Sequence, residues 1–216
     1  QINNLLNTDG TSTLSYIDNI DAPSASATLT LLVDDNGNTG GGSLTSSDTA
    51  VINITAVNDA PVATITPATY SATEQVALSL KNNGLAISDV DAAAGSMTVT
   101  LSVTEGTLTV TAGGSGAVVA NSGTSSVTIT GTVTQINNLL NTDGTSAVSY
   151  IDATDTPSAS TTLTLLVDDN GNTGGGSLTS SDTAVINITA VNDAPVATIT
   201  PATYSATEQV ALSLKN

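Results

Sequence analysis

The sequence predicts an all-β protein made of tandem β-sandwiches, with one short helix in each repeat. Apolar and polar residues alternate with period two along several short segments, as in strands that have one buried and one solvated face. Turn residues separate these segments, which is typical of sandwiches. A 134-residue unit also recurs along the chain, so the same strand pattern is met twice.

The repeat predicts the domain organisation. Residues 1–82 align without a gap with residues 135–216 and differ from them at six positions. A unit of 134 residues buries roughly two-thirds of its unfolded surface and can therefore fold as an independent domain. Within a longer native protein, we expect part of one repeat, a complete repeat and the start of a third. Their predicted ranges are 1–57, 58–191 and 192–216.

Strands are expected where the alternation is strict, at residues 76–80, 97–104, 107–111 and 126–130. Residues 161–167 and 183–191 are further predicted strands. In the last of them, apolar residues at even positions from Ala184 to Ala190 share one face. Glu105 and Gly106 predict a tight hairpin turn between the strands on either side.

Residues 134–141 are the exception, because their pattern predicts a short helix. Ile136, Leu139 and Leu140 are spaced by three and four, and the Thr134 hydroxyl can cap the first turn. Phe and Trp are absent from the chain, so Val, Ile, Leu and Ala must fill the core.

Composition excludes several classes of function. The chain has no His and no Cys, which excludes Ser-His-Asp and Cys-His catalysis, zinc sites and haem ligation. Its formal net charge is −17, and Lys81 and Lys215 are its only cations, so neither nucleic acid nor an anionic membrane is an expected partner. No apolar run is long enough to span a bilayer. Disorder is disfavoured because 39% of the residues are hydrophobic and only 10% are charged.

Acidic and amide side chains surround a motif that occurs in both copies. Thr55–Val62 contains Val-Asn-Asp-Ala-Pro-Val, and the same residues return at Thr189–Val196. This motif resembles the linker of bacterial cadherin-like repeats in giant secreted surface adhesins. The order of the strand Leu163–Val167, the loop Asp168–Gly171 and the linker is also similar to that family, as is Asp89-Val90-Asp91. The resemblance implies Ig/cadherin-like Greek-key sandwiches joined through calcium.

Elementary coordination chemistry favours the same ion. Ca²⁺ takes six to eight oxygen ligands from carboxylates, amides and carbonyls. Asn58 and Asp59 offer both types before the stiff Pro61, and Asp89 and Asp91 can bend around one ion. The family pattern adds Asp168 at this junction and a second set at the next one. That second set is Glu74, Asp152, Asp155, Asn192 and Asp193.

The simpler interpretation of each Asp is turn chemistry, since Asp hydrogen-bonds its own backbone in loops. The segment Asp34–Asn38, which recurs at Asp168–Asn172, begins like an EF-hand loop. It then departs from that pattern, because Thr39 and Thr45 stand where Gly and Glu are needed. We expect a hairpin loop there, with its first Asp as a candidate ligand.

These features predict a calcium-rigidified stalk of an extracellular adhesin on a bacterial cell surface. Its partners would be neighbouring repeats of the same chain, with like chains or cell-surface ligands as further candidates. The first alternative is a filament or sheath subunit, and the second is a glycan-binding module. The chain has only four aromatic residues, all Tyr, which weighs against sugar binding. No enzymatic activity is expected, because the acids lie beside a repeated linker rather than in a cleft.

Overall fold

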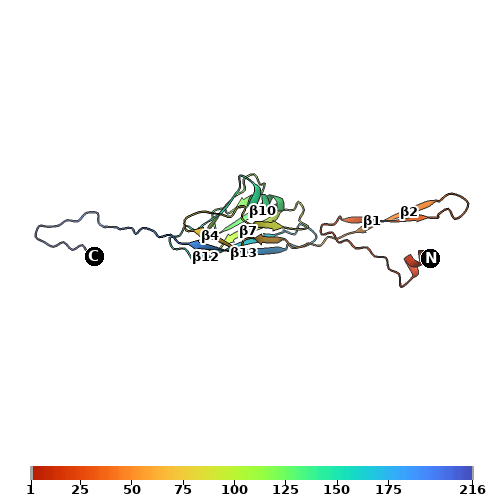
Figure 1. The fold of residues 1–216 in the computed structure, drawn as a ribbon, viewed down its shortest axis with the longest axis horizontal. Coiled ribbons are helices and arrows are strands. Elements are labelled where there is room, and N and C mark those ends of the chain that lie inside the picture. Colours follow the sequence, from red (N-terminus) through yellow and green to blue (C-terminus); the bar gives the residue numbers. More distant parts are fainter. Residues whose placement is uncertain (1, 216) are drawn as a thin grey trace.

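The structure is a computed structural model that describes residues 2–215. A packed β body lies in the middle of an elongated molecule (Figure 1). A hairpin projects from one end of this body, and the C-terminal segment extends from the other. None of the helices described between residues 2 and 215 is long and apolar enough to cross a membrane.

The largest sheet of the body has six strands in the order β4–β13–β12–β7–β10–β9. All neighbours in it are antiparallel except β13 and β4, which run parallel. The strands are β4 (Thr69–Thr73), β7 (Met97–Val103), β9 (Val118–Ala120), β10 (Ser126–Gly131), β12 (Ser160–Asp168) and β13 (Thr179–Thr189).

Two smaller sheets complete the body. One has the order β5–β11–β8 and the other pairs β3 with β6. Their strands are β3 (Val62–Ile65), β5 (Leu78–Ser79), β6 (Leu85–Ser88), β8 (Thr107–Thr111) and β11 (Ala147–Ile151). Side chains of all three sheets meet in one hydrophobic core. The buried apolar residues of the described chain all lie between Ala63 and Ile188, and the domain boundaries themselves stay predictions.

Alternation explains why these segments are strands. Along β7 every second side chain is buried, from Met97 through Val99 and Leu101 to Val103, while the Thr and Ser residues between them are half-exposed. The prediction of a mostly β protein is confirmed. The strand expected at 76–80 shrinks to the two residues of β5, and the buried face of β13 ends at Ile188, so that Ala190 is exposed.

The hairpin predicted at Glu105 and Gly106 is wrong. The turn does connect β7 to β8, but β7 pairs with β10 and β12, whereas β8 pairs with β11 in another sheet. Both edges of β7 are therefore occupied, and the chain crosses between sheets at this turn. Gly106 has a φ of +86°, and a Cβ there would lie 2.5 Å from Cε2 of the buried Tyr150 ring. Any other residue at position 106 would therefore have a strained backbone, and its side chain would clash with Tyr150.

The short helix is present, but its cap lies two residues before the predicted one. It consists of α1 (Val133–Asn137) followed by a π-helical turn, η2 (Asn138–Thr142). The cap is Thr132 rather than Thr134, because Thr132 and Gln135 form a reciprocal capping box. Ile136, Leu139 and Leu140 are fully buried, as their spacing predicts.

The N-terminal copy forms only part of this structure. Strands β1 (Ser26–Asp34) and β2 (Thr45–Asn53) pair in the register that β12 and β13 use, and η1 (Asn4–Thr8) matches η2. Leu31 in β1 is 50% exposed, whereas its copy Leu165 in β12 is completely buried. Two nearly identical segments thus form hairpins with the same register, and only the hairpin of β12 and β13 is buried by neighbouring strands.

Candidate metal sites at the two ends of the body

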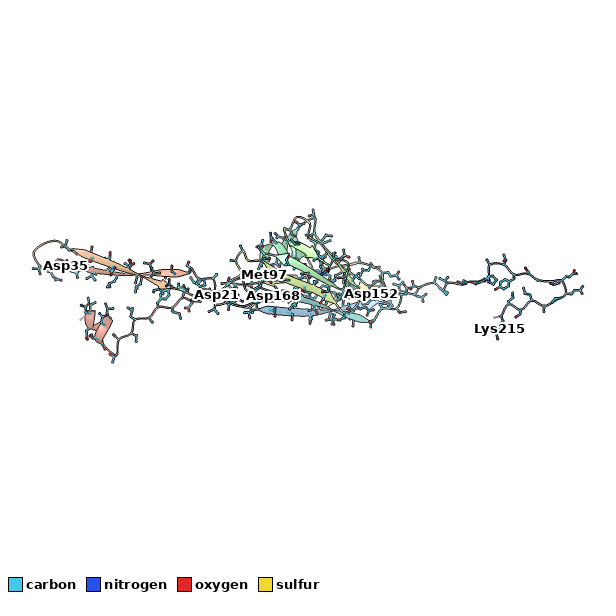
Figure 2. The ribbon with its side chains drawn as sticks, turned by 180° about the vertical axis from the view of Figure 1, so that it is seen from behind. Asp21, Asp35, Met97, Asp152, Asp168 and Lys215 are labelled. Carbon is cyan, nitrogen blue, oxygen red and sulfur yellow. The ribbon has the colours of Figure 1, made fainter. Side chains whose placement is uncertain are left out.

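Carboxylate side chains gather at both ends of the β body. The upstream cluster, where the chain enters the body, consists of Asn58, Asp59, Asp89, Asp91 and Asp169. The downstream cluster, where the chain leaves it, consists of Glu74, Asp152, Asp155 and Asp193. Figure 2 shows the two ends through the labelled Asp168, beside the upstream cluster, and Asp152, at the opposite end.

A tight turn after β6 holds the first two acids of the upstream cluster. Oδ1 of Asp89 accepts hydrogen bonds from the backbone N of Asp91 at 3.0 Å and of Ala92 at 2.9 Å. This turn brings Asp91 into the body, where it is only 2% exposed. Burial, reinforced by the neighbouring Asp91, raises the pKa of Asp89. The turn therefore holds two carboxylates close together, one of them buried.

The linker lies directly on this turn. The backbone N of Asp59 donates to Oδ2 of Asp91 at 2.9 Å. The side-chain amide of Asn58 donates to Oδ2 of Asp169 at 2.7 Å and to the carbonyl of Gly176 at 2.9 Å. Residues from the linker, from the turn after β6 and from the loop after β12 thus meet at one point.

Asp169, and not the predicted Asp168, is the acid that the β12 loop brings to this cluster. Burial opposes its ionisation, but hydrogen bonds from the backbone of Gly171 and Leu178 and from Asn58 outweigh it and lower the pKa of Asp169. Asp168 instead accepts hydrogen bonds from Asn170 and Ser177 within its own loop. The parity of the strand could have shown this, because Leu163, Leu165 and Val167 face the core and position 169 continues their face.

Several buried oxygens of the upstream cluster have no hydrogen-bond partner among the described residues. They are Oδ1 of Asn58, Oδ2 of Asp89 and Oδ1 of Asp91. A buried polar group normally has a partner, and an unpaired buried carboxylate costs several kcal/mol. This arrangement is suited to a cation that the oxygens could share.

A cavity of about 340 Å³ opens beside the linker on its upstream side. Its lining includes Asp18 and Asp21 from the N-terminal copy together with Asp59. Asp18 and Asp21 stand 134 residues before Asp152 and Asp155, so the repeat could have identified them as members of this junction.

The downstream cluster is arranged around the end of β4. Glu74 follows this strand and is 1% exposed, and its Oε2 accepts a hydrogen bond from the backbone N of Val191 at 2.7 Å. Carboxylate oxygens of Glu74, Asp155 and Asp193 lie within 4.8 Å of one another, and these three residues could hold a metal ion. Asp155 also accepts a hydrogen bond from the Gln75 side chain at 2.8 Å.

Asp152 adds a second buried acid to this end. It is 1% exposed, its Oδ1 accepts two hydrogen bonds from Thr154, and its carbonyl accepts one from Gln75. Oε1 of Glu74, Oδ2 of Asp152 and the hydroxyl of Tyr150 are buried without partners among the described residues. Burial, together with the charges of Asp152 and Glu105, raises the pKa of Tyr150.

The chemistry of the donors limits which ion fits. The clusters offer carboxylate and amide oxygens and no nitrogen or sulfur ligand, a set that suits hard cations such as Ca²⁺ and Mg²⁺.

Lys81, the only Lys inside the body, donates to the backbone carbonyls of Asp143 and Ser146, which belong to neither cluster.

The structure therefore brings together most of the predicted ligands, in two groups. Asn58, Asp59, Asp89 and Asp91 meet upstream, and Glu74, Asp152, Asp155 and Asp193 meet downstream. Asp168 is held in its own hairpin loop, and Asn192 is exposed in the extended segment beyond β13. Asp169, Asp18 and Asp21 are the residues that the sequence prediction missed.

Neither family models nor curated proteins give a match to this chain.

Proposed function

We propose that this chain is a segment of a calcium-rigidified stalk belonging to an extracellular bacterial adhesin or surface protein. In this proposal each repeat is a Greek-key sandwich of the Ig/cadherin-like kind. Ca²⁺ at each junction neutralises carboxylates from two successive repeats and fixes the angle between them. The function is reach and stiffness, with attachment to a target carried by other parts of the protein.

The unpaired oxygen of Glu74 carries this proposal. Its Oε1 is buried without a partner among the described residues, beside Asp155 in the loop between β11 and β12 and Asp193 in the linker after β13. Carboxylate oxygens of these three residues lie within 4.8 Å of one another, and a cation between them would neutralise their like charges. An ion bound here would join the body to the chain that leaves it, which is the property a stiff stalk needs.

The two clusters also support the proposal by their positions. They lie at opposite ends of the body, each at a linker with the same sequence. The upstream cavity places Asp21 with Asp59, and the downstream cluster places their copies Asp155 and Asp193 together. In the proposed stalk, these corresponding pairs of acids would lie at two successive junctions.

Thermal melting of the 216-residue chain, first in EDTA and then with added Ca²⁺, tests the proposal. An ion that binds only the folded state at 100 times its Kd stabilises by about 2.7 kcal/mol, which corresponds to a rise in Tm of roughly 10 °C. Asp91→Asn and Glu74→Gln should each remove part of this gain. In EDTA neither variant should melt much below the wild type, because each removes a repelling charge.

The repeat provides the control. Glu208 has the same sequence surroundings as Glu74 but is exposed in the C-terminal segment, so Glu208→Gln should keep the full calcium gain. Mg²⁺ in place of Ca²⁺ identifies the ion, because Mg²⁺ gives up its water reluctantly and should stabilise less. A Tm that does not respond to Ca²⁺ would overturn the proposal. Light scattering of the same samples separates a single stalk from a filament subunit, since only the latter grows with concentration.

A further inference from the structure

The loop between β12 and β13 contacts the linker that enters the body. Residues 173–176 of this loop read Thr-Gly-Gly-Gly, and we call them the glycine loop. A Cβ added to Gly174 would lie 2.3 Å from the carbonyl oxygen of Ala56, and one added to Gly175 would lie 3.0 Å from Cβ of Asn58. The linker backbone therefore passes so close to the loop that no side chain fits between them.

Hydrogen bonds hold both partners of this contact in place. Thr173 donates from Oγ1 to the carbonyl of Asp91 at 2.7 Å, which ties the loop to the turn after β6. Asn58 donates to the carbonyl of Gly176, and Asp59 donates to Asp91. The glycine loop and the turn after β6 thus both hold the linker, and these contacts are hydrogen bonds between protein groups.

The N-terminal copy shows that the loop has room for side chains where no linker is present. Gly40, Gly41 and Gly42 have the same sequence as the glycine loop, and a Cβ on any of them would meet nothing within 4 Å. The close approach at Gly174 is therefore caused by the linker and not by the loop's own shape.

We propose that the glycine loop is a clasp that binds the upstream linker without a metal ion. Residues 56–59 then belong to the downstream repeat before calcium arrives, and bending of the metal-free junction is confined to the residues upstream of Ala56. Calcium only has to add the acids of the preceding repeat. This inference rests on the proposed string of repeats, but not on calcium binding.

Backbone order parameters measured by ¹⁵N NMR in EDTA test the clasp. Asn58 and Asp59 should be rigid, with S² above about 0.8. Asn192 and Asp193 have the same sequence but no glycine loop beside them, and they should fall below about 0.6. Equal mobility at the two linkers in the wild-type chain would overturn the proposal without any substitution.

Substitution of the glycines isolates the contact. Gly174→Ala should make Asn58 and Asp59 as mobile as Asn192 and Asp193, whereas Gly40→Ala should leave them rigid. The two glycines have φ values of +62° and +73°, so both variants carry similar backbone strain and differ mainly in the clash with the linker. If Gly174→Ala and Gly40→Ala behave alike, the clasp does not exist.

A milder pair keeps the test valid if Gly174→Ala disturbs the body. Gly175→Ala should loosen Asn58, and its copy Gly41→Ala should not, because only Gly175 approaches the Asn58 side chain. The order parameters are measured in EDTA, so they test the clasp independently of calcium binding. The rise in Tm with added Ca²⁺ tests calcium binding, and it can occur whether or not the clasp exists.

Discussion

Asn58 donates a hydrogen bond from Nδ2 to Oδ2 of Asp169 at 2.7 Å, although the two residues lie 111 positions apart in the chain. The bond joins the linker to the loop after β12, at the far end of the repeat in sequence. The upstream junction is therefore held by the first and last parts of the same repeat.

Asn58→Ala should lower the stability of the body in EDTA. The substitution removes an amide that bonds a carboxylate and a carbonyl, and hydrogen bonds to charged groups contribute roughly 1.5–3 kcal/mol. Because Asn58 is only half-buried, we expect a loss of about 1–2 kcal/mol, measured by urea unfolding.

Asn192→Ala is the matched control for this prediction. Asn192 has the same neighbours in sequence but is exposed, so its loss should stay within about 0.5 kcal/mol. Equal effects of the two substitutions would show that the contact with Asp169 contributes nothing.

Asp169→Asn should reduce the calcium-dependent rise in Tm more than Asp168→Asn. Asp169 is buried and faces Asn58, whereas the carboxylate of Asp168 is occupied by Asn170 and Ser177. A neutral amide is a weaker ligand for Ca²⁺ than a carboxylate. Melting curves in EDTA and in excess Ca²⁺ give the comparison.

Asp35 provides the control, because it is the copy of Asp169 in the projecting hairpin. Asp35→Asn should leave the calcium gain of the body unchanged. If Asp168→Asn reduces the calcium-dependent rise in Tm more than Asp169→Asn does, then Asp168 is the ligand, as the sequence predicts, and Asp169 is not.

Asp143 should contribute stability that acid removes. Hydrogen bonds from the side chain and backbone of Thr145, joined by the backbone of Ser146, lower its pKa to about 2. Since the folded pKa lies below the unfolded value of about 3.9, this stability is complete above pH 4 or so. It is lost as the pH falls towards about 2.

The stability gap between wild type and Asp143→Asn should therefore narrow as the pH falls. Urea midpoints of both proteins at several pH values from 5 to about 2 measure it. Asp9 is the copy of Asp143 outside the body, so Asp9→Asn should leave the body's midpoint unchanged throughout. If the difference in stability stays constant with pH, the pKa of Asp143 is the same in the folded and unfolded states, and the prediction is wrong.

Local pattern predicted four strands closely, but it placed the start of β13 four residues late and missed β4 and β11. β7, β8 and β10 follow strict alternation over at least five residues, and the predicted and observed bounds of these strands and of β12 nearly coincide. β9 has only three residues, and strands this short carry too little pattern to be recognised. A turn signal also says nothing of which sheet the next strand joins, so the hairpin at Gly106 could not be distinguished from a crossover.

The family pattern names Asp168, but the structure places the neighbouring Asp169 beside Asn58. The sequence alone could have chosen Asp169, because residue 169 continues the buried face of Leu163, Leu165 and Val167. The contact between Gly174 and Ala56 had no such signal. It depends on two segments that are more than a hundred residues apart, and glycines in a loop ordinarily indicate a turn.

Leu165→Ala and Leu31→Ala should differ sharply although the two residues occupy the same place in the repeat. Leu165 is fully buried in β12 between β7 and β13, so its truncation should cost about 2–5 kcal/mol through lost burial and a residual cavity. Leu31 is 50% exposed in β1, which pairs only with β2 among the described strands, and its truncation should leave the unfolding of the body unchanged. Urea unfolding of the two variants against wild type measures both effects. A similar loss for Leu31→Ala would mean that the projecting hairpin packs on an apolar partner in solution, as the filament alternative requires.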